Sequence, residues 1–375
     1  MAISIREFLN ASQLTRLARD TRLMDAMRLI RRALGLADTP TPQAQPPLEP
    51  AAAPAPALKQ ESPVKLSAKL RPALPARPAS FTEHEFKFAE ECYAYRLYLP
   101  GGADAETLAK APVPLVVLLH GCQQDAADFA QGTAMNELAE QEKCIVLYPE
   151  QLSKANSLRC WNWFETAHQE RQSGEPGMIA ALTRQMIEHH NADPARVYIA
   201  GLSAGGAMAA LVAGLYPELF AAVGVHSGIP TGAASNVMSA FSAMRRGARR
   251  TTLAQESDGM MPTIVFHGSA DKTVHPDNGA QIVDAALVAW DASGLALKKS
   301  QRTEDGVADT DGATGSRSSV RTTYSAADGK SYIEHWAVGS GPHAWSGGSA
   351  TGSFTDPQGP DASQAMLEFF LQHHK

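Results

Sequence analysis

Residues 196–206, RVYIAGLSAGG, carry the pattern G-x-S-x-G at Gly201, Ser203 and Gly205. The pattern is weak alone, but here a buried apolar strand precedes it and a helix rich in Ala and Gly follows. So sharp a turn forces the serine into an unfavourable backbone conformation, and only small flanking residues allow neighbouring segments to approach. The turn exposes the hydroxyl and directs a helix N-terminus at developing negative charge. We therefore expect a nucleophilic Ser203, with an ordinary tight turn as the alternative.

Strands and helices alternate on both sides of this turn. Continuous apolar runs predict strands that are buried on both faces of a mostly parallel sheet. The alternation predicts an α/β fold with a doubly wound sheet and helices on both faces. The predicted strands are 93–100, 113–120, 144–149, 196–203, 221–228, 262–269 and 332–338, and the predicted helices are 133–142, 177–190, 204–215, 279–290 and 366–373. Residues 304–319, rich in Gly, Ser and Asp, predict a flexible hairpin tip.

Three regions are expected along the chain. Residues 1–36 form a predicted basic amphipathic helix, whose seven Arg and three acids give a charge of +4. Residues 37–80 form a predicted Pro/Ala-rich linker, disordered or extended, because eleven of the 24 prolines lie between Pro40 and Pro78. Residues 81–375 form the predicted catalytic domain.

Composition excludes several classes of protein. A net charge of −6 argues against a general nucleic-acid binder, and no apolar run reaches the roughly 20 residues that span a bilayer. Arg6 and Glu7 lie where the apolar region of a signal peptide would be, which predicts a cytoplasmic protein. In a reducing cytosol the four cysteines would all be thiols, and no metal-type cysteine spacing is present.

A nucleophilic serine needs a histidine base and an acid that orients the histidine. In this fold the acid and then the histidine follow the serine along the chain. Asp271 lies on a loop directly after a predicted strand, whereas Asp277 suits a helix cap. His343 lies after the last strand in GSGPHAWSGG, while His335 is within a strand. The sequence thus predicts the triad Ser203, Asp271 and His343, with His373 and His374 as weaker alternatives at the chain end.

An oxyanion also needs backbone donors. One expected donor is the N–H of Ala204, the residue after the nucleophile. The other is the N–H of Cys122 in the HGCQ segment (120–123), with Gln123 as the alternative. Loss of one such donor typically costs about 3 kcal/mol of transition-state stabilisation.

Five segments together resemble the polyhydroxybutyrate depolymerase family of α/β-hydrolase esterases, which includes feruloyl and acetylxylan esterases. They are HGCQQ (120–124), CWNWF (160–164), DPARVYIAGLSAGGAMA (193–209), HGSADKTVHP (267–276) and GPHAWSGG (341–348). The resemblance covers roughly residues 90–372. Its serine, aspartate and histidine correspond to Ser203, Asp271 and His343.

The resemblance also implies roles outside the triad. His120, Gln123, Trp161 and Trp163 are expected to bind substrate, with simple loop packing as an equal alternative for the two tryptophans. Cys122 and Cys160 belong to the family's motifs and are expected to lie close together. In an exported protein they could pair, which leaves their state open here.

The implied activity is a serine carboxylic-ester hydrolase that needs no metal or organic cofactor. The expected substrates are hydroxyalkanoate esters or oligomers, and the alternatives are feruloyl or acetylxylan esters, thioesters or peptides. An extracellular location, as in secreted members, is the alternative to the cytoplasm. Residues 1–36 are the expected contact with granules, a membrane surface or a second copy of the chain.

Overall fold

The computed structural model describes residues 78–102, 111–248, 260–306 and 316–375. The expected N-terminal helix (1–36) and nearly all of the expected linker (37–80) lie outside the described residues, as do the partner contacts assigned to residues 1–36. Within the described residues, no helix has both the length and the apolar character needed to cross a membrane.

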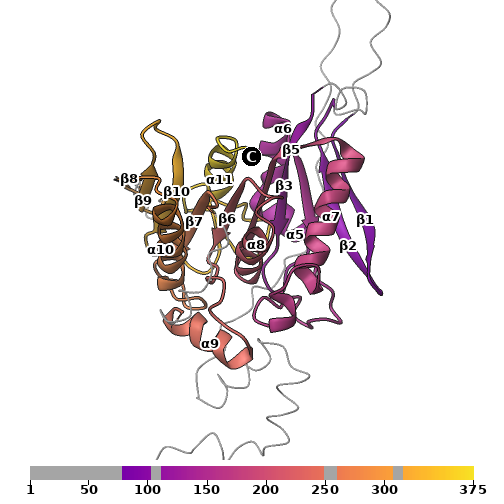
Figure 1. Cartoon of the computed structure of the whole chain (residues 1–375), viewed down its shortest axis with the longest axis horizontal. Coiled ribbons are helices and arrows are strands. Elements are labelled where there is room, and N and C mark those ends of the chain that lie inside the picture. Colours follow the sequence, from indigo (N-terminus) through magenta and orange to yellow (C-terminus); the bar gives the residue numbers. More distant parts are fainter. Residues whose placement is uncertain (1–77, 103–110, 249–259, 307–315) are drawn as a thin grey trace, which may run out of the picture.

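A ten-stranded sheet forms the centre of the molecule, in the order β1-β2-β4-β3-β5-β6-β7-β10-β9-β8 (Figure 1). The six strands from β4 to β10 in this order are parallel, and two antiparallel strands extend the sheet at each end. The strands are β1 Ser80–Phe88, β2 Glu91–Leu99, β3 Val113–Leu119, β4 Ile145–Pro149, β5 Ala192–Leu202, β6 Ala222–His226, β7 Thr263–Gly268, β8 Lys298–Glu304, β9 Ser319–Ser325 and β10 Ser331–Val338. A separate parallel pair joins β11 Trp345–Ser346 to β12 Thr355–Asp356.

The continuous apolar strands supply two hydrophobic cores, one on each face of the sheet. In β3, Leu115, Val117 and Leu119 enter one core, while Val116 and Leu118 enter the other. All five side chains are fully buried. Successive side chains on a strand point to opposite faces, so a strand covered by helices on both sides must be apolar throughout.

Helices cover both faces of the sheet. Side chains of α7, α8, α9 and α10 belong to one core, and side chains of α5, α6 and α11 belong to the other; Figure 1 shows the two layers in front of and behind the strands. The helices are α5 Ala126–Thr133, α6 Met135–Glu142, α7 Gly174–His190, α8 Ala204–Leu215, α9 Val237–Arg246, α10 Asp277–Ala292 and α11 Ala362–Phe370, with a 3-10 turn, η1, at Thr166–His168.

The main α/β series matches the sequence expectation, but several elements differ from it. The terminal helix was expected over 366–373 and instead begins at Ala362, because the Asp361 carboxylate caps it by accepting a hydrogen bond from the N–H of Gln364. The hairpin expected at 304–319 is present, because β8 and β9 pair antiparallel with Glu304 opposite Ser319, and residues 307–315 of its tip lie outside the described part. The elements that the sequence did not lead us to expect are β1, α5, η1, α9, β8, β9, β11 and β12.

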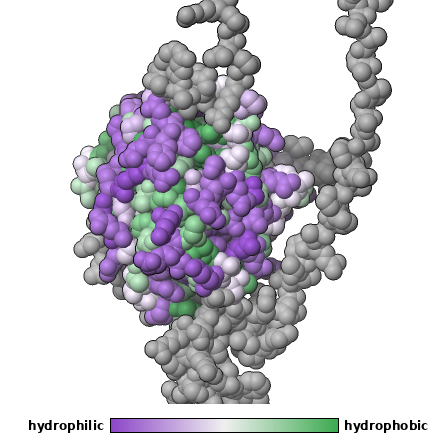
Figure 2. Space-filling view, turned by 90° about the vertical axis from the view of Figure 1, so that its right-hand side faces the viewer, coloured by the Kyte–Doolittle hydropathy of each residue, from purple (hydrophilic) through white to green (hydrophobic). Residues whose placement is uncertain are grey.

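The first edge of the sheet is polar. Residues 82–85 of β1, Thr-Glu-His-Glu, are all exposed. Figure 2 shows that this side of the molecule is largely hydrophilic, with apolar residues in interrupted patches between the polar ones. Charged side chains on an edge strand discourage pairing with another chain, so the β1 edge is protected in this way.

Candidate active site

Ser203 occupies a sharp turn between β5 and α8. Its backbone angles, φ 58° and ψ −119°, lie outside the favoured regions for an L-residue. The N–H of Ser203 donates to the carbonyl of His226 on β6 at 2.8 Å, so the neighbouring strand fixes the turn. The serine therefore lies at the carboxyl end of the central parallel strands, at the start of a helix.

The two glycines of G-x-S-x-G are required by close backbone contacts. A Cβ atom on Gly201 would lie 2.4 Å from the carbonyl carbon of Gly205. A Cβ atom on Gly205 would lie 2.1 Å from the carbonyl oxygen of Leu119 on β3. Because real Cβ atoms do not approach backbone atoms this closely, neither position accepts a larger residue without movement of β3 or α8.

The structure brings Ser203, His343 and Asp271 into one hydrogen-bonded chain. Ser203 Oγ lies 2.9 Å from His343 Nε2, and His343 Nδ1 lies 2.7 Å from Asp271 Oδ2. A carboxylate only accepts hydrogen bonds, so the proton of the neutral imidazole lies on Nδ1 and Nε2 is free to accept from the serine hydroxyl. This is the geometry that a serine nucleophile and its base require.

Four donors surround the Asp271 carboxylate. Oδ1 accepts from the N–H groups of Thr273 and Val274, both at 2.8 Å, and His267 Nε2 lies 3.4 Å from Oδ2. Burial raises the pKa of Asp271, but the hydrogen bonds from His267, His343 and Val274 together lower the pKa further, well below its ordinary range. Asp271 is therefore a carboxylate at every pH at which the protein is expected to work.

Two loops that carry the acid and the base are bonded to each other. The N–H of Ala270 donates to the carbonyl of Gly341 at 3.0 Å, and the N–H of Ser340 donates to Ser269 Oγ at 2.8 Å. A Cβ atom on Gly268 would lie 2.2 Å from the Gly341 oxygen, so the glycine allows this approach. The loops after β7 and β10 therefore behave as one support for Asp271 and His343.

His226, which the sequence analysis did not identify, connects the serine to the histidine loop. Its carbonyl holds the N–H of Ser203, and its Nε2 accepts from the N–H of Ser346, three residues after His343, at 2.9 Å. Burial lowers the pKa of His226 to about 3, so the imidazole is neutral and Nε2 remains an acceptor. Only its position at the end of a buried strand could have indicated this role.

One expected oxyanion donor, Ala204, lies at the start of α8, and the other, Cys122, lies on the loop after β3. Ala204 is the first residue of α8, and the first N–H groups of a helix have no partner inside the helix. Among the hydrogen bonds of the described residues, the N–H of Cys122 has no acceptor. The alternative donor is engaged, because the N–H of Gln123 donates to the carbonyl of Leu158 at 2.6 Å. The geometry thus favours Cys122 over Gln123.

Gln124, also missed in the sequence, shapes the loop that carries Cys122. Its buried Oε1 accepts from the N–H of Gly121 at 3.0 Å. Its Nε2 donates to Asp128 Oδ2 at 2.9 Å and to the carbonyl of Ser353 at 3.0 Å. The side chain therefore fastens the turn before Cys122 to α5 and to the segment before β12.

Cys122 and Cys160 form a disulfide, with their Cα atoms 4.3 Å apart. The expectation that all four cysteines are thiols is wrong for this pair and holds for Cys92 and Cys144. The bond joins the loop after β3 to the loop after β4. The segment with the expected oxyanion donor is thereby fixed to the CWNWF segment.

Two of the four expected substrate contacts are instead structural. His120 is fully buried. Its Nδ1 donates to the Gly121 carbonyl at 2.8 Å, and its Nε2 accepts from the N–H of Gln151 at 3.1 Å. Both ring nitrogens are therefore engaged, and neither is left for a substrate. Trp161 is fully buried and its Nε1 donates to the His120 carbonyl at 3.1 Å, which is the packing alternative. Trp163 is also buried, with 4% of its surface exposed. Of the four residues expected to contact substrate, only Gln123 is exposed.

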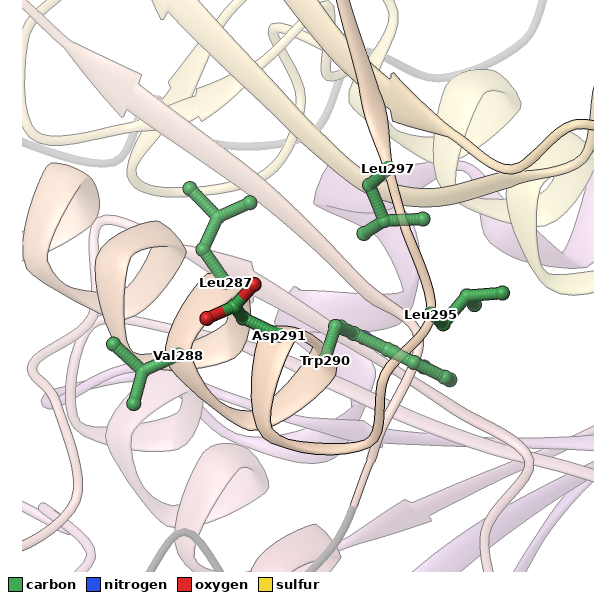
Figure 3. A pocket seen from close by; sticks show the side chains of 6 residues that line it. All are labelled: Leu287, Val288, Trp290, Asp291, Leu295 and Leu297. Carbon is green, nitrogen blue, oxygen red and sulfur yellow. The ribbon is translucent and has the colours of Figure 1, made fainter.

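A surface hollow of about 340 Å³ lies elsewhere, on α10 and the segment before β8 (Figure 3). It is lined by Leu287, Val288, Trp290, Asp291, Leu295 and Leu297. All six residues are near the C-terminal end of α10 or beyond it, whereas Asp271 precedes the N-terminus of that helix. The helix is about 24 Å long, so this hollow is not part of the candidate active site.

The curated proteins to which this chain is similar include depolymerases and esterases. The chain is 38% identical over 184 residues to poly(3-hydroxyalkanoate) depolymerase C of Paucimonas lemoignei, which covers 46% of this chain and 44% of that protein. It is 31% identical over 180 residues to acetylxylan esterase A of Talaromyces purpureogenus, which covers 44% of this chain and 46% of that protein. The chain spans about half the length of these curated relatives.

Among solved structures, an acetyl xylan esterase from Aspergillus awamori matches with a TM-score of 0.55 at 20% identity, over 78% of this chain and 99% of that one. At this identity the match shows the α/β-hydrolase type of fold. The family model described as esterase PHB depolymerase matches residues 93–303. That range contains Ser203 and Asp271, and His343 lies beyond it, joined to them by the geometry above. On this match over more than half of its length, the chain belongs to the PHB depolymerase family of esterases.

Proposed function

We propose that this protein is a serine carboxylic-ester hydrolase that acts through an acyl-enzyme. The observation that carries the proposal is the hydrogen-bonded chain from Ser203 through His343 to Asp271 at the carboxyl ends of β5, β10 and β7. Family membership supports the same class of reaction.

In the first step Ser203 Oγ attacks the ester carbonyl carbon while His343 Nε2 accepts the hydroxyl proton. Asp271 holds the Nδ1 proton in place and stabilises the imidazolium charge. The tetrahedral intermediate then collapses, the bond to the alcohol oxygen breaks, and His343 returns the proton to that oxygen. The products are a free alcohol and an ester on Ser203.

In the second step water attacks the acyl-enzyme and His343 accepts its proton. Collapse of the second intermediate breaks the bond to Ser203 Oγ, which takes the proton back and releases the acid. The N–H groups of Cys122 and Ala204 would stabilise the negative oxygen in both intermediates. Because Ala204 begins α8, the helix dipole adds to this stabilisation.

The substrate class that we propose is hydroxyalkanoate esters or oligomers, on the similarity to poly(3-hydroxyalkanoate) depolymerase C. The acetylxylan and feruloyl esterases among the relatives make those esters the second candidate. We further propose an oxidising compartment, since disulfides such as Cys122–Cys160 persist there and are rare in the cytosol.

The test is hydrolysis of p-nitrophenyl acyl esters, hydroxybutyrate oligomers, methyl ferulate and acetylated xylan by wild type and Ser203→Ala. We expect wild type to cleave the oligomers best, and the variant to lose at least about 10³-fold in kcat. Preference for methyl ferulate or acetylated xylan would replace the substrate proposal and keep the mechanism. Undiminished activity in the variant would overturn the mechanism itself.

A further inference from the structure

A buried carboxylate lies behind the candidate site. Glu175, in the first turn of α7, is 1% exposed. Its Oε1 accepts from Gln151 Nε2 at 2.6 Å and from Asn162 Nδ2 at 2.7 Å. Its Oε2 accepts from the backbone N–H of Asn162 at 2.7 Å. Three N–H donors thus converge on one carboxylate in the protein interior.

Each donor belongs to a segment next to the candidate oxyanion site. Asn162 separates Trp161 from Trp163, and Gln151 Nε2 also donates to the carbonyl of Cys160 at 2.9 Å. The N–H of Gln151 donates to Nε2 of His120 at 3.1 Å. Since Cys160 is bonded to Cys122, Glu175 is connected to both loops that carry the expected donor and the tryptophans.

The donors determine which protonation state of Glu175 fits. Amide N–H groups only donate, so an ionised carboxylate accepts all three in charge-assisted hydrogen bonds, whereas a neutral carboxylic acid accepts them more weakly and carries a hydrogen of its own. The orientation of the Asn162 side chain is fixed, because Asn162 Oδ1 accepts from Asn156 Nδ2 at 3.0 Å. Protonation of Glu175 therefore weakens the hydrogen bonds that hold Gln151 and Asn162.

The titratable groups that face Glu175 give it no cation. His168 on η1 has Nδ1 3.8 Å from Glu175 Oε2, but this nitrogen accepts the N–H of Glu175, and burial lowers the pKa of His168, so the ring is neutral. Tyr93 on β2 and Glu165 before η1 are the other groups that interact with the carboxylate. Burial raises the pKa of Glu175 to about 7, against hydrogen bonds that lower it.

We propose that Glu175 is a positioning residue for the oxyanion loop, and that the site is fully assembled only when the Glu175 carboxylate is ionised. The proposal rests on the proposed esterase function. The ionised carboxylate holds Gln151 and Asn162, these hold His120 and the Cys160 segment, and the disulfide passes the position on to Cys122. Protonation weakens the bonds to Gln151 and Asn162, and the backbone N–H of Cys122 is then placed less accurately for the oxyanion.

The experiment measures kcat and KM for p-nitrophenyl butyrate between pH 5 and 9 in wild type, Glu175→Gln and Glu188→Gln. Glu188 is exposed on the same helix and serves as the matched control. In wild type and in the control, we expect kcat to fall on the acid side with uptake of two protons, one by the catalytic base and one by Glu175. In Glu175→Gln we expect a one-proton acid limb, a roughly 10-fold lower kcat at pH 8.5 and a KM within about twofold of wild type.

A one-proton acid limb in wild type overturns the proposal, even if the variant fails to fold. Unchanged kcat and an unchanged two-proton limb in Glu175→Gln overturn it too. Infrared difference spectra give a readout that does not depend on activity: a buried carboxylic-acid band should disappear between pH 6 and 8 in wild type and be absent in the variant. No such band means that Glu175 does not titrate there. Activity that survives in Ser203→Ala would instead contradict the proposed function. In that case the infrared spectra alone would decide whether Glu175 titrates between pH 6 and 8.

Discussion

Asp271 shows how one residue combines charge and orientation. Its two oxygens divide the work: Oδ1 accepts two backbone N–H groups, and Oδ2 faces His343. The backbone bonds fix the carboxylate in the loop after β7, and the bond to His343 fixes which imidazole nitrogen carries the proton. Loss of the charge alone should therefore disturb catalysis more than folding.

Asp271→Asn tests this division. The amide can still accept two backbone N–H groups with its oxygen, but its NH₂ group would face His343 and favour the tautomer with the proton on Nε2. That tautomer cannot accept from Ser203, so we expect kcat to fall about 10³- to 10⁴-fold, with little change in KM. Steady-state kinetics at pH 8 provide the measurement. Asp277→Asn, at the exposed start of α10, is the control and should keep wild-type kcat. Equal losses in the two variants would remove Asp271 from the triad.

At the scale of elements, the site depends on loops rather than on strands. The loops after β3 and β4 are tied by the disulfide across 38 residues of chain. By the loop-closure estimate, a link of this length stabilises the folded state by about 4 kcal/mol, and measured values are commonly 2–4 kcal/mol. Because the same link positions Cys122, its removal should affect both stability and catalysis.

The variant Cys122→Ala/Cys160→Ala should lower the free energy of unfolding by about 2–4 kcal/mol and reduce kcat by about 10-fold. Urea denaturation and ester hydrolysis measure the two effects. Cys92→Ala, at an exposed cysteine on β2, should change neither. Protein purified without reductant should carry two free thiols, Cys92 and Cys144, and a count of four would contradict both the bond and the oxidising compartment.

The sequence predicts the elements whose composition is dictated by burial. The strands β3 to β7 and the turn at Ser203 are continuous apolar or small-residue runs, and these have few alternative structures. By contrast β8, KKSQRTE, is an almost fully exposed edge strand whose pairing with β9 comes from the backbone and leaves no apolar pattern. Glu175, Gln151 and His226 are single polar residues, and their roles depend on partners distant in the chain.

At the scale of the whole molecule, the two buried carboxylates near the site have opposite effects on stability. The pKa of Asp271 is lowered, so its ionised form stabilises the folded state above its ordinary pKa, and that contribution is lost as pH falls. The pKa of Glu175 is raised, so the folded state holds its proton more tightly than the unfolded state does. The form that we propose to be most active, with Glu175 ionised, therefore carries a destabilising charge in its interior. Such a conflict between stability and function is common at functional sites.

The sign of this second effect can be measured without any substrate. The contribution of Glu175 to stability is fully present below its ordinary pKa of 4.5 and is lost as pH rises through about 7. A difference of about 2.5 in pKa, at about 1.4 kcal/mol per pH unit, corresponds to about 3 kcal/mol. Glu175→Gln carries no such charge, so its free energy of unfolding minus that of wild type should increase between pH 5 and pH 8 by up to this amount.

Urea denaturation of both proteins at pH 5, 6, 7 and 8 gives this difference, and Glu188→Gln should show a nearly constant one. The absolute stability of Glu175→Gln at any one pH also includes its altered hydrogen bonds, so the slope with pH is the quantity that isolates the charge. A flat difference for Glu175→Gln would mean that the carboxylate ionises at its ordinary pKa. The acid limb of the wild-type activity would then reflect the uptake of one proton only, because a group already ionised at pH 5 cannot contribute a second proton near neutrality.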